Sequence, residues 1–296
     1  MTQRPVIVGL GEILWDVFPD GPRFGGAPAN FACSAAGLAR ETANVFIAGA
    51  VGSDELGQRS LNALTERGVQ TDGVEINDRP TGRVLVHLDA DGKAEYEFES
   101  DAAWDRMSWT AALERLASGA DVLCFGTLGQ RSEQSRVTIQ RMVRATRKSC
   151  LRILDINLRP PFWTEACILE SLPLANVLKL NDSELPIVAA LLGLSGSDEN
   201  QLQQLRQRYQ LQLVALTRGA NGSLLVDAND RVDEQPGRRV TIADTVGAGD
   251  AFTAALAIGL LRSQPLSDVH RRAADVAAFV CSQPGATPTL PAQFVF

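Results

Sequence analysis

The chain has 296 residues, 45% of them hydrophobic, which is enough for one large α/β domain with a sizeable core. A formal net charge of −7 without a run of Lys or Arg argues against a nucleic-acid partner. The start lacks the apolar stretch of a signal peptide and no window approaches the roughly 20 apolar residues of a membrane span, so we expect a cytoplasmic protein with no membrane partner.

Taken in chain order, apolar β-rich runs alternate with helical patterns. Strands are predicted over residues 6–10 and 45–51, each followed by a helix, from about Ala29 and from Asp54. The rhythm resumes with strands over residues 121–125, 151–156, 177–180 and 211–217. This is typical of an α/β fold, a doubly wound, mostly parallel sheet with helices on both faces.

A different pattern interrupts this series. Residues 83–88 and 94–98 alternate polar and apolar with period two around Asp91-Gly92, a favoured hairpin turn. The apolar face of such a hairpin must be covered by the main domain, by a ligand or by a second copy of the chain. We interpret it as a small antiparallel β lid, formed by about residues 12–25 and 73–105 of a single domain over residues 1–296, with a homodimer through the lid as a further prediction.

Cysteine and histidine usage excludes several kinds of site. The five cysteines (Cys33, Cys124, Cys150, Cys167 and Cys281) form no Cys-x-x-Cys pair, which favours a reduced compartment. His87 and His270 are the only histidines, too few for a multi-histidine metal site. With only two histidines, a Ser-His-Asp triad is also improbable, and we assign neither histidine a catalytic role.

The strongest chemical motif is Thr245-Val-Gly-Ala-Gly-Asp-Ala-Phe252, which runs into a helical pattern. Gly247, Ala248 and Gly249 at a helix start leave backbone N–H groups free for an anion, and the helix dipole adds positive potential. Asp250 could accept the proton of a hydroxyl that attacks a phosphoryl group. The alternative is an ordinary helix N-terminus. Neither a dinucleotide fingerprint nor a Walker loop occurs, since Gly9-Leu-Gly11 lacks the third glycine.

The residues 244–252 and the stretch Gly25-Gly-Ala-Pro-Ala-Asn-Phe-Ala32 resemble the two signatures of the ribokinase-like, or PfkB, carbohydrate kinases, and the resemblance covers nearly the whole chain. It implies a ribokinase-like fold and an ATP-dependent kinase with Asp250 as catalytic base. It also implies that Gly25, Gly26, Asn30 and Asp16 bind sugar hydroxyls. Without the resemblance, Asn30 would be a helix cap and Asp16 a solvated turn residue.

The same resemblance implies the nucleotide and metal sites. Asn181 and Glu184 would order magnesium-bound water, although they could also cap a helix. Asp155 and Arg159 would lie near the transfer site, with Arg159 supplying positive charge to the moving phosphoryl group. The resemblance also implies that ATP binds beside segments that contain Thr217, Gly219, Gly222, Cys281, Gly285 and Asp244. Of these, the segment from Thr217 to Gly222 could equally form a plain turn. Asp244 would hold a potassium ion or would only cap its turn.

Substrate choice is the least constrained expectation. The stretches 26–30 and 102–105 look most like bacterial fructokinases, and Ala27 stands where ribokinase carries lysine. Phe98 and Trp104 could stack on a sugar ring or form the core of the lid. Fructose is the predicted substrate, with 2-keto-3-deoxygluconate, another ketose or a nucleoside as alternatives. A catalytically silent sugar-binding regulator, or a structural module that pairs through its hairpin, would be of a different class.

Overall fold

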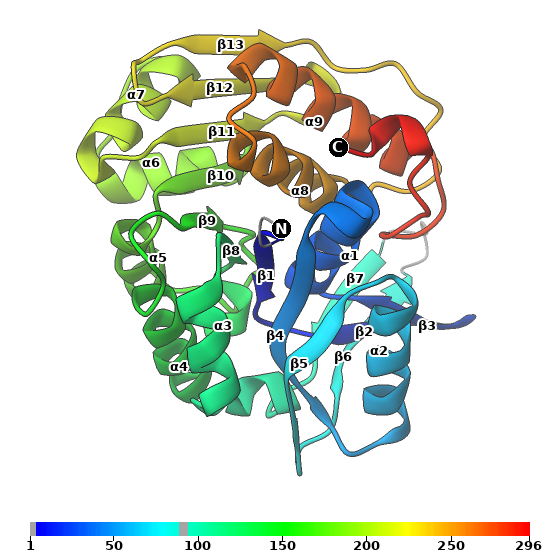
Figure 1. The fold of residues 1–296 in the computed structure, drawn as a ribbon. Coiled ribbons are helices and arrows are strands. Elements are labelled where there is room, and N and C mark those ends of the chain that lie inside the picture. The colour runs from blue at the N-terminus through cyan, green and yellow to red at the C-terminus, as the bar shows by residue number, and fades with distance from the viewer. Residues whose placement is uncertain (1–3, 89–93) are drawn as a thin grey trace.

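A nine-stranded sheet forms the centre of the computed structural model, which describes residues 4–88 and 94–296, without the side chains of residues 87–96 (Figure 1). The strand order is β13-β12-β11-β10-β9-β8-β1-β4-β5, and all neighbours pair in parallel except β11–β12 and β12–β13. The strands are β1 (Val6–Leu10), β4 (Asn44–Gly52), β5 (Gln70–Asn77), β8 (Val122–Phe125), β9 (Leu151–Asp155), β10 (Val177–Asn181), β11 (Leu213–Thr217), β12 (Ser223–Asp227) and β13 (Val232–Gln235).

Helices cover both faces of this sheet, and each face has its own apolar core. One core contains residues of α1 (Ala27–Ala39), α2 (Glu55–Glu66), α8 (Ala248–Leu261) and α9 (Leu266–Cys281). The other contains residues of α3 (Ala111–Gly119), α4 (Glu133–Arg144), α5 (Glu165–Ser171), α6 (Leu185–Leu192) and α7 (Asp198–Tyr209). Strands such as β1, buried on both sides, read as continuous apolar runs for this reason. None of the helices within the described ranges is long and apolar enough to cross a bilayer.

The predicted doubly wound sheet is confirmed. Every predicted strand is present within one or two residues, and Asp54 accepts a hydrogen bond from the Gly57 N–H as the cap of α2. The sequence analysis missed β5, β12 and β13. β5 and β13 are edge strands with many polar or exposed residues, so neither shows the apolar run used to find the others. β12 is fully buried but follows β11 through only a short turn.

A second, four-stranded sheet contains the segments predicted for the lid, in the order β3-β2-β6-β7, and we call this sheet the lid. Its strands are β2 (Leu14–Phe18), β3 (Gly21–Gly25), β6 (Gly82–Leu88) and β7 (Ala94–Phe98). The predicted hairpin is present as the antiparallel pair β6–β7, while the turn residues Asp91 and Gly92 lie outside the described residues. β2 pairs with β6 in parallel, so the lid sheet is mixed. The predicted lid range was too wide, because residues 73–77 belong to β5 in the main sheet.

The sheet topology defines where a site can form. The chain leaves β1 for β4 on one side and later returns to β8 on the other side, so the order reverses at β1. In open α/β sheets, ligands bind at such a switch point, beyond the carboxyl ends of the strands. The chain leaves that end of β1 through Gly11 to Ile13 and enters the lid at β2. The lid and the switch point are therefore neighbours.

Candidate active site

The glycine turn begins α8, as its sequence predicted. Gly247 is the N-cap with φ of 79°, a left-handed conformation that favours glycine. Asp250 lies in the first turn of the helix, and its Oδ2 accepts a hydrogen bond of 2.9 Å from Asn30 Nδ2 in α1. This contact joins the two predicted signatures across 220 residues of chain.

The start of α1 is equally constrained. Gly26 has φ of 104°, and a Cβ there would lie 2.6 Å from the carbonyl oxygen of Glu12, so only glycine fits. Asn30 is 4% exposed, and its Oδ1 has no hydrogen-bond partner within the described part of the chain. Asn30 therefore points from α1 toward Asp250 and does not cap its own helix.

The carboxyl group of Asp250 holds its proton more tightly than an exposed aspartate does. Its pKa is raised to about 6, because burial and the charge of Asp155 raise it by more than Asn30, Lys179 and Arg159 lower it. A general base works best when its pKa lies close to the pH of the reaction. Asp250 meets that condition better than an exposed aspartate would.

Glu12 is a buried carboxyl group that the sequence analysis did not single out. It is 2% exposed, and burial raises its pKa to about 7, with a further contribution from Asp250. Its Oε2 has no hydrogen-bond partner among the described residues. The available signal was its position, two residues after the strand that ends at Leu10, at the edge of the sheet where ligands bind.

Asp16 lies on β2 in the lid and is half-buried. Its pKa is raised to about 6, because burial raises it by more than the charges of Arg159 and Arg23 lower it. A Cβ on Gly25 would lie 3.0 Å from Asp16 Oδ2, so the glycine leaves room for this carboxylate. Arg159 is exposed, and its charge lowers the pKa values of Glu12, Asp16 and Asp250 together. These effects indicate that Arg159 lies among the three carboxyl groups.

A buried ion pair lies behind the glycine turn. Lys179 Nζ of β10 is 3.0 Å from Asp155 Oδ1 of β9, and both side chains are less than a tenth exposed. Asp155 Oδ2 accepts a 2.9 Å hydrogen bond from Thr253 Oγ1 in α8. Asp155 was predicted, but Lys179 and Thr253 were missed. A lysine within the apolar strand Val177–Asn181 was the signal that could have identified Lys179.

Asn181 and Glu184 form a closed turn after β10. Glu184 is 2% exposed and accepts backbone N–H bonds from Leu158 at 2.9 Å and Asn181 at 2.8 Å, and burial raises its pKa. The Asn181 side-chain oxygen accepts bonds from the N–H groups of Ser183 and Glu184. Both predicted interpretations are compatible with this geometry. The remaining lone pairs suit a water-mediated contact with Mg²⁺, which keeps much of its water, better than direct ligation.

The segments predicted for the nucleotide side are connected to one another. Thr217 is paired in register with Asn181, and the Arg218 N–H donates to Gly222 O at 2.7 Å to close the turn. Elsewhere, Cys281 O accepts bonds from the N–H groups of Ala243 and Asp244. The carboxylate of Asp244 accepts bonds from the N–H groups of Val246 at 3.0 Å and Gly285 at 3.2 Å. Asp244 thus joins its own loop to the loop of Gly285, as a capping residue does. We call this pair of contacts the Asp244 clasp.

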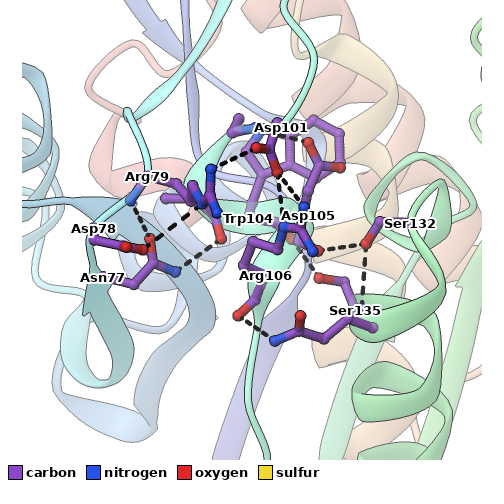
Figure 2. A network of polar contacts seen from close by, with 12 residues as sticks. Asn77, Asp78, Arg79, Asp101, Trp104, Asp105, Arg106, Ser132 and Ser135 are labelled. Carbon is purple, nitrogen blue, oxygen red and sulfur yellow. Dashed lines mark hydrogen bonds and ion pairs between the residues drawn. The ribbon is translucent and has the colours of Figure 1, made fainter.

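Trp104 occupies the core of a separate cluster. It is 2% exposed, its carbonyl accepts a hydrogen bond from Ser135 (Figure 2), and the Arg131 guanidinium covers its ring at 3.9 Å. This geometry favours the lid-core alternative over stacking on a sugar. A cavity of about 740 Å³ lies beside this cluster, lined by residues that include Ser100, Arg131 and Phe162. Its lining comes from the end of the lid, the start of α4 and the loop after Arg159, not from Asp250.

His270 lies between a serine and an aspartate, an arrangement not expected from the sequence. Its Nε2 is 2.6 Å from Ser223 Oγ, and its Nδ1 is 2.5 Å from Asp233 Oδ1. His270 is fully buried, and Ser223 is 3% exposed. With no access for a substrate, this triad ties α9 to β12 and β13. Among the described residues, no cluster of three or more His, Cys, Asp or Glu could hold a metal ion.

Residues 21–293 match the family model of the pfkB family carbohydrate kinases. The chain is a PfkB family carbohydrate kinase. This kinase is 31% identical over 319 residues to a probable fructokinase-5 from Arabidopsis thaliana, covering 98% of this chain and 96% of the relative. Membership confirms the predicted family and the expectation of a sugar kinase, a phosphotransferase.

Solved structures confirm the ribokinase-like fold of the kinase. A fructokinase from Xylella fastidiosa with bound ATP has a TM-score of 0.85 at 26% identity, covering 98% of this chain and 96% of that one. A 2-dehydro-3-deoxygluconokinase from Thermotoga maritima has a TM-score of 0.86 at 19% identity, covering 97% and 96%. The likeness to kinases for two different sugars leaves the substrate open.

Proposed function

We propose that this kinase transfers the γ-phosphoryl group of ATP to the primary hydroxyl of fructose, with Asp250 as the catalytic base. The observation that carries the proposal is the hydrogen bond between Asp250 and Asn30, which brings the predicted base and a predicted sugar ligand together. The fructokinases among its relatives support fructose as the substrate. 2-Keto-3-deoxygluconate is the second candidate, since a kinase named for that sugar shares the fold.

The proposed reaction needs few groups. Asn30, Asp16 and the Gly25-Gly26 backbone hold the sugar hydroxyls, and Asp250 takes the proton as the hydroxyl oxygen bonds to the γ-phosphorus. The bond from that phosphorus to the bridging oxygen breaks, and ADP leaves. The N–H groups of the Gly247 to Gly249 turn stabilise the charge on the phosphoryl oxygens, because a helix start offers free donors and a positive potential. Arg159 adds a positive charge from an exposed side chain.

The nucleotide would lie across the segments that the Asp244 clasp joins. Val240, Ile242 and Val246 are exposed large apolar residues on the loop that leads to the glycine turn. An adenine base beside Cys281 and Gly285 would cover part of this surface. Mg²⁺, held through water by Asn181 and Glu184, would neutralise phosphate charge.

The lid would exclude water from the reaction. β2 carries Asp16 into the site, and Phe98 at the end of β7 contacts Phe162 with ring centroids 5.2 Å apart. Closure of the lid on a bound sugar would prevent hydrolysis of ATP by water. We propose this role for the lid in place of the purely structural pairing module.

A sugar-panel assay with an active-site variant tests the proposal. We expect ADP release with fructose as the best acceptor, and Asp250→Asn should lower turnover by roughly 10² to 10⁴ while the fold and ATP binding persist. A preference for 2-keto-3-deoxygluconate would replace the substrate but keep the mechanism. Sugar-dependent thermal stabilisation without any ADP release would instead identify a silent binding protein.

A further inference from the structure

Lys179 is a positive charge buried directly against the glycine turn. A Cβ built on Gly249 would lie 3.1 Å from Lys179 Nζ. The lysine is held there by its 3.0 Å contact with Asp155. Asp155 also accepts a hydrogen bond from the hydroxyl of Thr253, which lies in α8 one helical turn after Gly249. That hydroxyl in turn contacts the carbonyl oxygen of Gly249 at 3.0 Å. A chain of contacts thus connects β10, β9 and the start of α8.

We propose that Lys179 is a positioning residue of the phosphoryl-transfer centre: through Asp155 and Thr253 it fixes the Gly249 end of the turn, and it supplies the buried positive charge beside Asp250. The inference rests on the proposed role of Asp250 as base. Lys179 itself need not touch either substrate, because its side chain is only 7% exposed.

The surroundings of Lys179 keep it charged. Its Nζ lies 3.0 Å from Asp155 Oδ1, and both side chains are less than a tenth exposed, so the ion pair is shielded from water. A buried lysine without carboxylates would lose its proton, and a buried cluster of carboxylates without a cation would bind protons. Lys179 is therefore the cation that lets several acidic groups share this small volume.

The two partners of the ion pair act on Asp250 in opposite directions. Asp155 raises the pKa of Asp250, whereas Lys179 lowers it. The charged or titratable groups that face Asp250 come from four strands or the loops after them: Glu12, Cys124, Asp155, Arg159 and Lys179. Removal of either partner breaks the same contact, but the two removals change the charge near Asp250 with opposite sign.

The test compares the pH dependence of kcat in Lys179→Met and Asp155→Asn, two substitutions that nearly preserve shape. We expect both to lower kcat, by roughly 10²-fold if the turn is displaced. The acid limb of the profile, which reports the base, should move to higher pH in Lys179→Met and to lower pH in Asp155→Asn. The double variant should recover part of the activity lost in Lys179→Met, because no buried carboxylate is left unpaired.

A merely structural ion pair would give a different result. Both variants would lose activity while the acid limb stayed in place or moved in one direction, and that outcome would overturn the inference. If Lys179→Met does not fold, Asp155→Asn and the double variant still test the inference. Only an effect of the Asp155 charge on Asp250 moves the acid limb of Asp155→Asn to lower pH. Asp250→Asn in the same assay separates the two proposals. Retained turnover in Asp250→Asn would contradict the proposal that Asp250 is the base. Lost turnover in Asp250→Asn, together with unshifted acid limbs in the Lys179 and Asp155 variants, would contradict only the role of Lys179.

Discussion

At the residue scale, the site concentrates carboxyl groups that hold protons unusually tightly. Burial raises the pKa values of Glu12, Asp16 and Asp250 to about 7, 6 and 6. A carboxyl group whose pKa is higher in the folded than in the unfolded chain favours folding at low pH. Its contribution is fully present below the unfolded pKa and is lost as the pH rises through the folded value. The free protein is therefore less stable at neutral pH than at mildly acid pH on account of these groups.

Glu12 gives the clearest prediction of this kind. Its pKa rises from 4.5 to about 7, which corresponds to a loss of stability on the order of 3 kcal/mol between about pH 4.5 and pH 7. Glu12→Gln removes the titration, so the stability of the variant relative to the natural protein should increase with pH. Urea unfolding at pH 5 and pH 8 measures this difference. An unchanged difference at the two pH values would show that Glu12 does not titrate in this range.

The residues that could be predicted from the sequence are those in contiguous motifs. Asp250 and Asn30 each stand in a glycine-containing stretch at a helix start, and their roles were predicted from the resemblance of these stretches to the family signatures. Glu12 and Lys179 were missed because each is an isolated charged residue, Glu12 two residues after the strand β1 and Lys179 within the strand β10. Their significance depends on contacts with distant segments, which only the folded arrangement supplies. Trp104 could not be placed for the same reason, since its burial depends on Arg131.

At the element scale, a buried arginine fastens the end of the lid to the main domain. Arg131 bonds Asp105 through Nε at 2.8 Å and Nη2 at 2.6 Å, and its guanidinium lies over the rings of Trp104 and Phe162. The neighbouring arginines, Arg79 and Arg106, make exposed pairs with Asp101 (Figure 2). The two kinds of ion pair should differ strongly in their importance for stability.

Arg131→Leu should lower the free energy of unfolding by about 3–5 kcal/mol, because it leaves Asp105 buried and unpaired. Arg79→Ala is the matched control and should change stability by little more than the error of measurement. Chemical denaturation of both variants gives the comparison. Equal effects would show that the Arg131 contact contributes no more than a surface pair.

The Asp244 clasp makes a second prediction at this scale, about potassium. Its carboxylate already accepts two backbone N–H groups, which supports a capping role. We expect Asp244→Ala to be less stable and to bind ATP more weakly. Kinase rates in potassium and in tetramethylammonium, at constant ionic strength and magnesium, then test for a cation. Equal rates for the natural protein would mean that the clasp acts alone, and a potassium response that Asp244→Ala abolishes would place the ion at this turn.

At the scale of the whole molecule, the fold was more predictable than the site. Buried parallel strands are visible in the sequence as apolar runs, and their alternation with helical patterns indicates the doubly wound sheet. The edge strands β5 and β13 and the parallel pairing of β2 with β6 were not foreseen, because pairing partners are set by tertiary contacts. The lid was recognised by its period-two alternation, but its limits depend on which strands join the other sheet.

The bond between Asn30 and Asp250 also bears on when, during synthesis, the enzyme becomes active. The proposed sugar ligands lie in the first 30 residues, but the proposed base, Asp250, is 220 residues beyond Asn30. At about 5–20 residues per second, the ribosome needs roughly 10 to 40 s to travel that distance. Throughout this interval the nascent chain lacks both the proposed base and the glycine turn. The proposed mechanism therefore predicts that an incomplete chain does not consume ATP and that prematurely terminated products lacking α8 are inert.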